Sequence, residues 1–151
     1  MRVKDVMTTE VVCCSLEETA QAAAKLMKIQ DIGAIPVVAD LGSMKLEGIV
    51  TDRDLCCSVV AEDESPHVVR VLEVMTRNPV TCKAEDTLDH CGALMKKFRV
   101  RRLPVVDKQG RCIGIVAQGD LARHTAAAKF KEVVATISTP AHAKRAIHAV
   151  A

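Results

Sequence analysis

The feature that most constrains this sequence is an internal duplication. Along most of the 151-residue chain, residues recur in kind 68 positions later. The equivalent segments are Val6-Met7-Thr8 and Val74-Met75-Thr76, Val12 and Val80, Cys14 and Cys82, Glu17 and Glu85, Thr19 and Thr87, Leu26-Met27 and Leu94-Met95, and Ile35-Pro36-Val37-Val38 and Leu103-Pro104-Val105-Val106. The offset falls to 66 at Gly48-Ile49-Val50 and Gly114-Ile115-Val116, because the first copy has the longer loop before this segment. Such register predicts two copies of one folding unit packed together.

Each copy has the pattern of a mixed α and β unit. A strand is expected at 11–14, followed by a helix whose start is indicated by Ser15-Leu16-Glu17-Glu18, which has the spacing of a capping box. In the second copy Lys83 takes the place of Ser15 and lacks the capping hydroxyl. Two strands are expected at 34–39 and 46–51, and a second helix from Asp52. The first of the two helices carries apolar residues at i, i+3, i+4 and i+7, which are Ala20, Ala23, Ala24 and Met27.

The order β-α-β-β-α, repeated, predicts an α+β (α/β-like) fold. The first repeat is expected at 3–60, a linker at 61–70 and the second repeat at 71–124. A unit of this size buries too little surface to be comfortably stable alone. We therefore expect the repeats to pack sheet to sheet as one pseudo-twofold module with a shared core. A helical tail is expected over 125–151, with apolar residues at 126, 130, 133 and 137 and a break at Thr139-Pro140.

Composition narrows the classes of function. The chain is 49% hydrophobic and 26% charged, and its 21 basic and 19 acidic residues give a net charge of +2. It has no Trp or Tyr and 2 Phe, so it lacks the basic stripe and aromatic platforms typical of nucleic-acid binding. No apolar run is long enough to span a bilayer, and the charged start Met1-Arg2-Val3-Lys4-Asp5 does not resemble a signal peptide. We expect a cytoplasmic protein that binds neither nucleic acid nor membrane.

Seven cysteines leave two interpretations open. None of them forms a C-x-x-C pair, so neither a zinc site nor a thioredoxin-type site is predicted. Cys14 and Cys82 occupy equivalent strand positions, which favours small buried side chains in a reducing compartment. The adjacent pairs Cys13-Cys14 and Cys56-Cys57 also allow a thiol redox sensor. In that case a disulfide would link separate segments, because neighbouring cysteines bridge each other only with backbone strain.

The segment Gly48-Ile49-Val50-Thr51-Asp52-Arg53-Asp54 is where binding chemistry is expected. A strand ends and a helix begins here, so Thr51 lies at a helix N-terminus whose free N–H groups suit a phosphate. Asp54, one turn later, offers a carboxylate to paired ribose hydroxyls. The same residues are also ordinary helix-capping choices, and the motif alone does not decide between the two. Its recurrence after the second apolar-Pro strand favours a ligand site.

Several segments form a recognisable combination: Val6-Met7-Thr8, Val74-Met75-Thr76, Ile32-Gly33-Ala34-Ile35-Pro36-Val37, Val100-Arg101-Arg102-Leu103-Pro104-Val105 and the two Gly…Asp motifs. On these residues the chain resembles a tandem cystathionine-β-synthase-type (CBS) pair, or Bateman module, over about residues 3–124. Residues 31–37 together with 51–55 are similar to small stand-alone bacterial members, including the hypoxic response type. The resemblance implies a ligand that lies across both repeats, with Thr and Asp of one copy at phosphate and ribose and apolar residues of the other copy at the base.

Carried over by position, the resemblance implies two sites. The first would use Gly33, Ala34, Thr51, Arg53 and Asp54, with Val80 and Val100 at the base. The second would use Val12, Ile32, Arg101, Arg102, Ala117, Gln118 and Asp120. Because Ala117 replaces the Thr, the second site loses a hydroxyl worth about 1.5–3 kcal/mol, or roughly ten- to a hundredfold in affinity. Either the arginines compensate or this site is weak, and we expect the first site to be the stronger.

The resemblance further implies a non-catalytic regulatory module that senses AMP, ADP, ATP or a related adenosyl ligand such as NADH or S-adenosylmethionine. It implies no required cofactor or metal, and a homodimer that signals to a downstream protein of unknown identity. The residues agree, since the sequence has no P-loop, no G-x-G-x-x-G, no H-E-x-x-H and no positioned nucleophile, and its 5 histidines are scattered. A ligand-independent dimerisation scaffold is the alternative.

Overall fold

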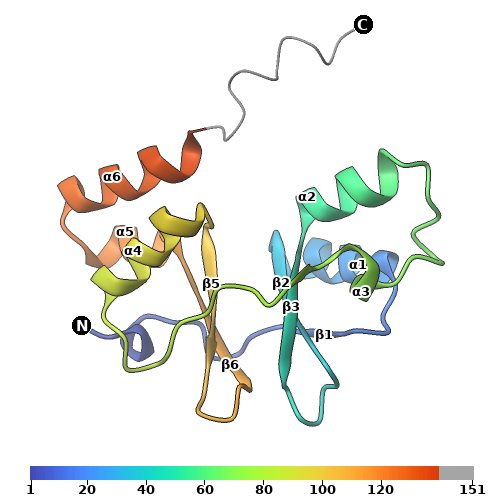
Figure 1. The fold of residues 1–151 in the computed structure, drawn as a ribbon, viewed down its shortest axis with the longest axis horizontal. Helices are drawn as coiled ribbons and strands as arrows, with labels where there is room; N and C mark the ends of the chain where they lie inside the picture. The colour runs from blue at the N-terminus through green and yellow to red at the C-terminus, as the bar shows by residue number, and fades with distance from the viewer. Residues whose placement is uncertain (140–151) are drawn as a thin grey trace, which may run out of the picture.

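The structure, a computed structural model, describes residues 1–139. Two β-hairpins lie side by side at the centre and helices flank them on the two outer sides (Figure 1). This is the mixed α+β architecture that the duplicated pattern predicts, and residues 140–151 of the expected tail lie outside the described residues. The elements in chain order are η1 (Val3–Asp5), β1 (Cys14–Ser15), α1 (Ala20–Gln30), β2 (Ala34–Val38), β3 (Leu46–Thr51), α2 (Asp52–Leu55), the π-helical turn η2 (Cys56–Val60), α3 (Val71–Val74), β4 (Thr76–Arg77), α4 (Leu88–Phe98), β5 (Arg102–Val106), β6 (Cys112–Ala117), α5 (Gln118–His124) and α6 (Ala127–Ser138).

The strand pairing of the first repeat recurs in the second. In the first, β1 pairs parallel with β2, and β2 pairs antiparallel with β3 so that Ala34 lies opposite Thr51. In the second, β5 pairs antiparallel with β6, and Arg102 lies opposite Ala117. A single parallel bridge from Cys82 to β5 takes the place of β1. Both repeats therefore end their hairpin at a strand–helix junction of the same kind.

The segment that precedes each repeat packs on the other repeat. Val3 is fully buried among side chains of the second repeat, and Val71 is fully buried among those of the first. Thr8 bridges Ile115 of β6, while β4 pairs with β3. The chain thus crosses twice between the two repeats. The segment before the first repeat packs on the second, and the segment before the second repeat packs on the first, so the two leading segments are exchanged.

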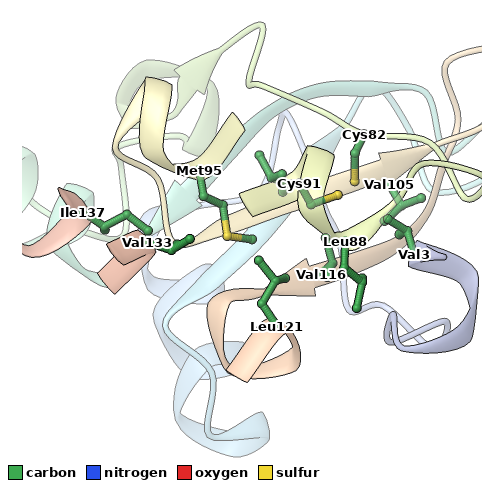
Figure 2. Packing of buried hydrophobic residues seen from close by; sticks show 11 residues of the cluster. Val3, Cys82, Leu88, Cys91, Met95, Val105, Val116, Leu121, Val133 and Ile137 are labelled. Carbon is green, nitrogen blue, oxygen red and sulfur yellow. The ribbon is translucent and has the colours of Figure 1, made fainter. Parts of the chain in front are cut away.

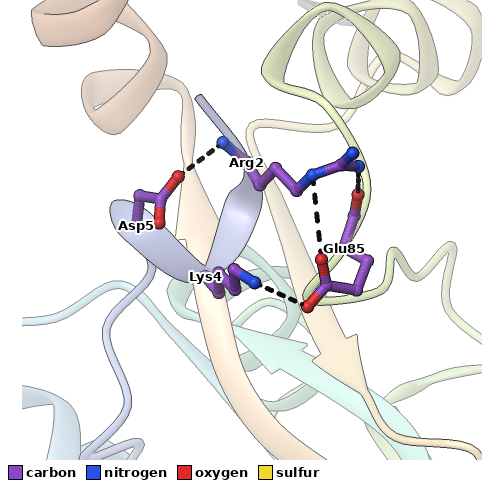
Figure 3. Close-up of polar contacts among 4 residues, drawn as sticks. All are labelled: Arg2, Lys4, Asp5 and Glu85. Carbon is purple, nitrogen blue, oxygen red and sulfur yellow. Dashed lines mark hydrogen bonds and ion pairs between the residues drawn. The ribbon is translucent and has the colours of Figure 1, made fainter.

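Ion pairs repeat this exchange at the surface. The Nε of Arg2 lies 3.7 Å from Oε2 of Glu85, and the Nζ of Lys4 lies 2.9 Å from Oε1 of the same residue (Figure 3). Arg70, the equivalent of Arg2, pairs with Glu17, the equivalent of Glu85. Exposed ion pairs contribute little stability each. The buried valines Val3 and Val71 therefore supply most of the stabilisation of the exchanged segments, and the ion pairs show that both segments dock in equivalent positions.

The structure has two hydrophobic clusters, one in each repeat, whereas the sequence predicts one shared core. The repeats depend on each other because Val3 and Val71 close the cluster of the opposite repeat. The first cluster consists of Cys14, Ala20, Ala23, Met27, Ile35, Val37, Val50, Leu55, Val59 and Val71. The second, drawn in Figure 2, consists of Val3, Cys82, Leu88, Cys91, Met95, Leu103, Val105, Val116, Leu121, Val133 and Ile137.

Two glycines allow the exchanged segments to approach the central strands. A Cβ on Gly48 would lie 2.8 Å from the carbonyl oxygen of Thr76, and one on Gly114 would lie 2.9 Å from that of Thr8. Any side chain at these positions would push the crossing segment away from its strand. This requirement gives a steric reason for the Gly-Ile-Val match between the repeats.

The predicted helix start at Ser15 is wrong. Helix α1 begins at Ala20, and the hydroxyl of its N-cap, Thr19, accepts a hydrogen bond from Ala22 N at 3.1 Å. Ser15 lies in β1, where it pairs with β2. Thr87 caps α4 as Thr19 caps α1, so the helix does not need a hydroxyl at Lys83.

Helix α6, which falls in the predicted tail, belongs to the core of the second repeat. It begins at Ala127 and packs against α4 and α5. Val133 and Ile137 are buried in the second cluster, and Phe130 packs against it. The apolar spacing therefore marks a face that the second repeat itself covers.

Candidate functional site

The first strand–helix junction brings four predicted residues together. Thr51 is the N-cap of α2, and its Oγ1 accepts a hydrogen bond from Asp54 N at 3.1 Å while Asp54 Oδ2 accepts one from Thr51 N at 2.8 Å. This reciprocal capping box fixes both side chains at the end of β3. Asp52 N donates to Gly33 O at 3.0 Å, and Ala34 lies opposite Thr51.

The capping hydrogen bonds of Thr51 and Asp54 leave one donor and one acceptor of these side chains unused within residues 1–139. Across residues 1–139 the structure pairs neither the hydroxyl proton of Thr51 nor Oδ1 of Asp54. Both residues are half-buried, so each presents part of its side chain to solvent. The hydroxyl can donate to an anionic oxygen, and the carboxylate oxygen can accept from a sugar hydroxyl.

The other residues of the first site are held by different parts of the fold. Arg53 is exposed on α2. Val80 and Val100 are half-buried and pack against the second cluster. They lie in the opposite repeat, as the resemblance implies. The cluster accounts for their packing, and their place at a ligand base stays a prediction.

Asp52 is a residue of this junction that sequence reasoning missed. Its Oδ1 accepts a hydrogen bond from Arg53 N at 2.8 Å. A Cβ on Gly33 would lie 2.9 Å from its Oδ2, so the glycine leaves room for this carboxylate. The signal was available, because Asp52 lies inside the Thr51-x-x-Asp54 motif.

The second junction has the same backbone frame with other side chains. Ala117 N donates to Asp120 Oδ2 at 2.7 Å, and Gln118 N donates to Arg101 O at 2.9 Å. Arg102 lies opposite Ala117. The structure therefore brings five predicted residues of the second site together, with two arginines in the places of the glycine and alanine of the first.

At the second junction the carboxylate has no free oxygen. Asp120 Oδ1 lies 2.6 Å from Nη2 of Arg123, which sequence reasoning missed although the i, i+3 spacing on α5 indicates the contact. Oε1 of Gln118 is buried and has no hydrogen-bond partner among the described residues. Val12 and Ile32 are half-buried, and Ile32 packs against the first cluster, so their place at a base also stays a prediction.

The cysteines divide between the two interpretations that the sequence leaves open. All seven are free thiols. Cys14 and Cys82 are buried, as their equivalence predicts, and burial raises the pKa of the Cys14 thiol to about 12. Cys56 and Cys57 are exposed, so the buried interpretation is wrong for this pair. No three His, Cys, Asp or Glu side chains within residues 1–139 are grouped so as to hold a metal ion.

A separate hollow of about 260 Å³ lies between α4, α5 and α6. Its walls include Leu88, Gly92 and Phe130, and they include no residue of the two predicted sites. Within the described part of the chain, no helix has both the length and the apolar character needed to cross a membrane.

Comparison with known proteins assigns both repeats to one family. The model of the CBS domain matches residues 3–61 and 71–127. The CBS domain-containing protein YhcV of Bacillus subtilis is 43% identical over 120 residues, which cover 80% of this chain and 82% of that protein. Hypoxic response protein 1 of Mycobacterium tuberculosis is 31% identical over 137 residues, which cover 91% and 94%.

Solved structures show the same fold. The CBS domain pair of protein MJ0100, in complex with 5'-methylthioadenosine and S-adenosyl-L-methionine, has a TM-score of 0.71 and 30% identity and covers 82% of this chain and 94% of that one. CBSX2 in complex with AMP has a TM-score of 0.69 and 27% identity and covers 81% and 93%. One relative with an enzyme's name, the L-aspartate semialdehyde sulfurtransferase of Methanocaldococcus jannaschii, is 30% identical over 121 residues, but only 22% of its length is matched.

Proposed function

Because the chain belongs to the CBS-domain family, we propose that it is a regulatory module that binds an adenosyl ligand between its repeats, chiefly at Thr51 and Asp54. The observation that carries this proposal is the capping pair, which leaves one hydroxyl donor and one carboxylate oxygen available. The ligands named for two structural neighbours, S-adenosylmethionine with methylthioadenosine and AMP, support an adenosyl group. ADP, ATP and NADH are the other candidates.

In the proposed complex each residue has one task. Asp54 Oδ1 accepts hydrogen bonds from the ribose hydroxyls, and the Thr51 hydroxyl donates to a phosphate or carboxylate oxygen. The side chains of Val80 and Val100 flank the adenine from the second repeat. Arg53, exposed on α2, adds positive charge beside the anionic end. The second junction is the weaker site, because it lacks the hydroxyl and its carboxylate is already paired.

We propose that the module itself catalyses no reaction and requires no cofactor. The matched region makes up only 22% of the sulfurtransferase, which leaves most of that enzyme for its chemistry. The module would instead report ligand binding to a downstream protein in the cytoplasm. The resemblance to the family also implies a homodimer, which sedimentation velocity can test.

Titration calorimetry with AMP, ADP, ATP, NADH and S-adenosylmethionine tests this function. We expect at least one of them to bind the wild type, and Asp54→Ala to weaken that binding roughly ten- to a hundredfold. Asp120→Ala, the matched control in the other repeat, should leave the stronger site unchanged. If no member of the panel binds, the proposed function is wrong. If Asp54→Ala binds as the wild type does, the assigned site is wrong.

A further inference from the structure

The first strand–helix junction is surrounded by more acids than bases. Three acids, Asp31, Asp52 and Asp54, stand there with one base, Arg53. None of the four takes part in an ion pair within residues 1–139. Asp31 ends α1 two residues before Gly33, whose carbonyl accepts the hydrogen bond from Asp52 N. The charges therefore lie around one short stretch of backbone and leave the first junction net negative.

The equivalent positions of the second repeat make its junction net positive. Three arginines, Arg99, Arg101 and Arg102, precede its Pro strand where the first repeat has one acid and two small residues. These arginines form no ion pair within the described part of the chain. The acid of this junction, Asp120, is neutralised by Arg123 at 2.6 Å. Duplicated positions thus carry charge of opposite sign in the two repeats.

Backbone contacts hold two of these arginines at the second junction itself. Gln118 N donates to Arg101 O at 2.9 Å, and Arg102 lies opposite Ala117 in the pairing of β5 with β6. Opposite residues of an antiparallel pair have Cβ atoms roughly 4.5–5.5 Å apart, so the Arg102 side chain begins beside the position of the missing hydroxyl. Arg101 is exposed and Arg102 is half-buried. Guanidinium groups bind phosphate through paired, charge-assisted N–H donors, so these two residues suit an anionic phosphate chain.

The second junction also has an acceptor that adds no negative charge. Gln118 occupies the position of Asp52, and its Oε1 is buried without a hydrogen-bond partner among the described residues. A buried acceptor of this kind costs free energy unless a donor reaches it. A ribose hydroxyl is such a donor. This junction can therefore hold a sugar although the second oxygen of Asp120 is taken by Arg123.

We propose that the two junctions divide adenosyl ligands by charge. The second binds a ligand with a phosphate chain, such as ADP or ATP, through Arg101 and Arg102. The first binds a ligand that is neutral or positive, such as S-adenosylmethionine with its sulfonium and ammonium groups. Like charges repel and unlike charges attract over about 8 Å before physiological salt screens them. The inference rests on the proposed function, because it assigns different ligands to the two sites described there.

Titration calorimetry of Asp54→Ala separates the two junctions. S-adenosylmethionine should bind this variant roughly tenfold more weakly than it binds the wild type, whereas ATP should keep its wild-type affinity. At the second junction of the variant we expect ATP to bind about tenfold more tightly than AMP. The titrations are made without divalent cations, so that the phosphate chain keeps its charge. Added salt should reduce the preference for ATP, because it screens the arginines.

A second substitution in the Asp54→Ala background tests the arginine wall. Arg101→Ala should weaken ATP binding about tenfold and AMP binding less. Lys108→Ala is the matched control, because it also removes one exposed positive charge. Lys108 lies in the turn between β5 and β6, at the end of the hairpin away from the junction (Figure 1). This control should leave the affinities for ATP and AMP unchanged.

The outcomes distinguish this inference from the proposed function. If no adenosyl ligand binds the wild type, the proposed function is wrong and the inference falls with it. If ligands bind but only one of S-adenosylmethionine and ATP is among them, or both lose affinity alike in Asp54→Ala, the division by charge is overturned while the function stands. It is also overturned if ATP binds the second junction no more tightly than AMP, or if Lys108→Ala weakens ATP binding as much as Arg101→Ala does.

Discussion

The two strand–helix junctions share one backbone frame and differ in the side chains that it presents. In each, the first helical N–H donates to a carbonyl at the start of the Pro strand, at 3.0 Å in the first repeat and 2.9 Å in the second. In each, an aspartate accepts a hydrogen bond from the N-cap N–H, at 2.8 Å from Asp54 and 2.7 Å from Asp120. Only the first junction adds a hydroxyl, that of Thr51, to this frame.

The difference separates the structural role of the motif from its binding role. Asp120 shows that the aspartate is retained as a cap even where its second oxygen is taken by Arg123. In the first repeat the position equivalent to Arg123 is Cys57, which has no charge to offer, and Asp54 Oδ1 stays free across residues 1–139. Duplication therefore preserves the fold of the junction, while the free donor and acceptor persist in one copy.

Thr51→Ala should have the largest effect on this comparison, because it removes the cap and the proposed ligand donor together. We expect the affinity for the adenosyl ligand to fall roughly ten- to a hundredfold and the free energy of unfolding to fall by about 1 kcal/mol. Calorimetry and chemical denaturation measure the two effects. Thr51→Ser keeps the hydroxyl and should stay near the wild type. Unchanged affinity in Thr51→Ala would make the first junction a cap alone, like the second.

Ala117→Thr makes the reverse change and should have the next largest effect. Ala117 has φ and ψ of −111° and 161°, close to the −118° and 163° of Thr51, so its backbone is already suited to a capping threonine. We expect a gain of about 1 kcal/mol in unfolding free energy and about tenfold in affinity at the second site. Ala117→Val adds similar bulk without a hydroxyl. Equal behaviour of the two variants would attribute the effect to packing.

The duplication predicts the two hairpins and both junctions from sequence, but it does not predict strand β4 or the exchange of leading segments, and it places strand β1 too early, at 11–14 instead of Cys14–Ser15. The two leading segments would match each other in the sequence in the same way whether each packed on its own repeat or on the opposite one. The choice depends on tertiary pairing, such as that of Thr8 with Ile115, which leaves no local pattern. The same reasoning explains the two clusters, since Val3 and Val71 match each other in sequence whichever core they close.

Capping and side-chain pairing show the same limit on a smaller scale. Ser15 and Thr19 both suit a helix start, and propensity does not distinguish them. Backbone pairing decides, because Ser15 is drawn into β1 beside Val38 while Ala20 N donates to Val69 O at 2.8 Å. The occupied second oxygen of Asp120 likewise depends on a rotamer of an arginine three residues away. Sequence therefore predicts which residues meet at a junction more readily than which of their atoms stay free.

Arg123→Ala tests whether the ion pair keeps Asp120 from binding. The side chain of Arg123 is 69% exposed, so loss of the pair should change the unfolding free energy by less than about 1 kcal/mol. The freed Oδ1 should raise affinity at the second site about two- to fivefold, as calorimetry of the Asp54→Ala background would show. Lys129→Ala removes a comparable surface pair with Asp89 and should leave affinity unchanged. A fall in affinity would instead assign Arg123 to the ligand.

Gly33→Ala should have the smallest effect, because the neighbour that must yield is an exposed side chain. The added Cβ would lie 2.9 Å from Oδ2 of Asp52, but Asp52 is an exposed side chain that can turn away. The equivalent position in the second repeat holds Arg101, whose carbonyl makes the same hydrogen bond as that of Gly33, so the backbone tolerates a side chain there. We expect a change within about 0.5 kcal/mol in chemical denaturation. A loss of 2 kcal/mol or more would mean that the Asp52 carboxylate is fixed in place, and the first junction would then differ from the second in rigidity as well as in its free atoms.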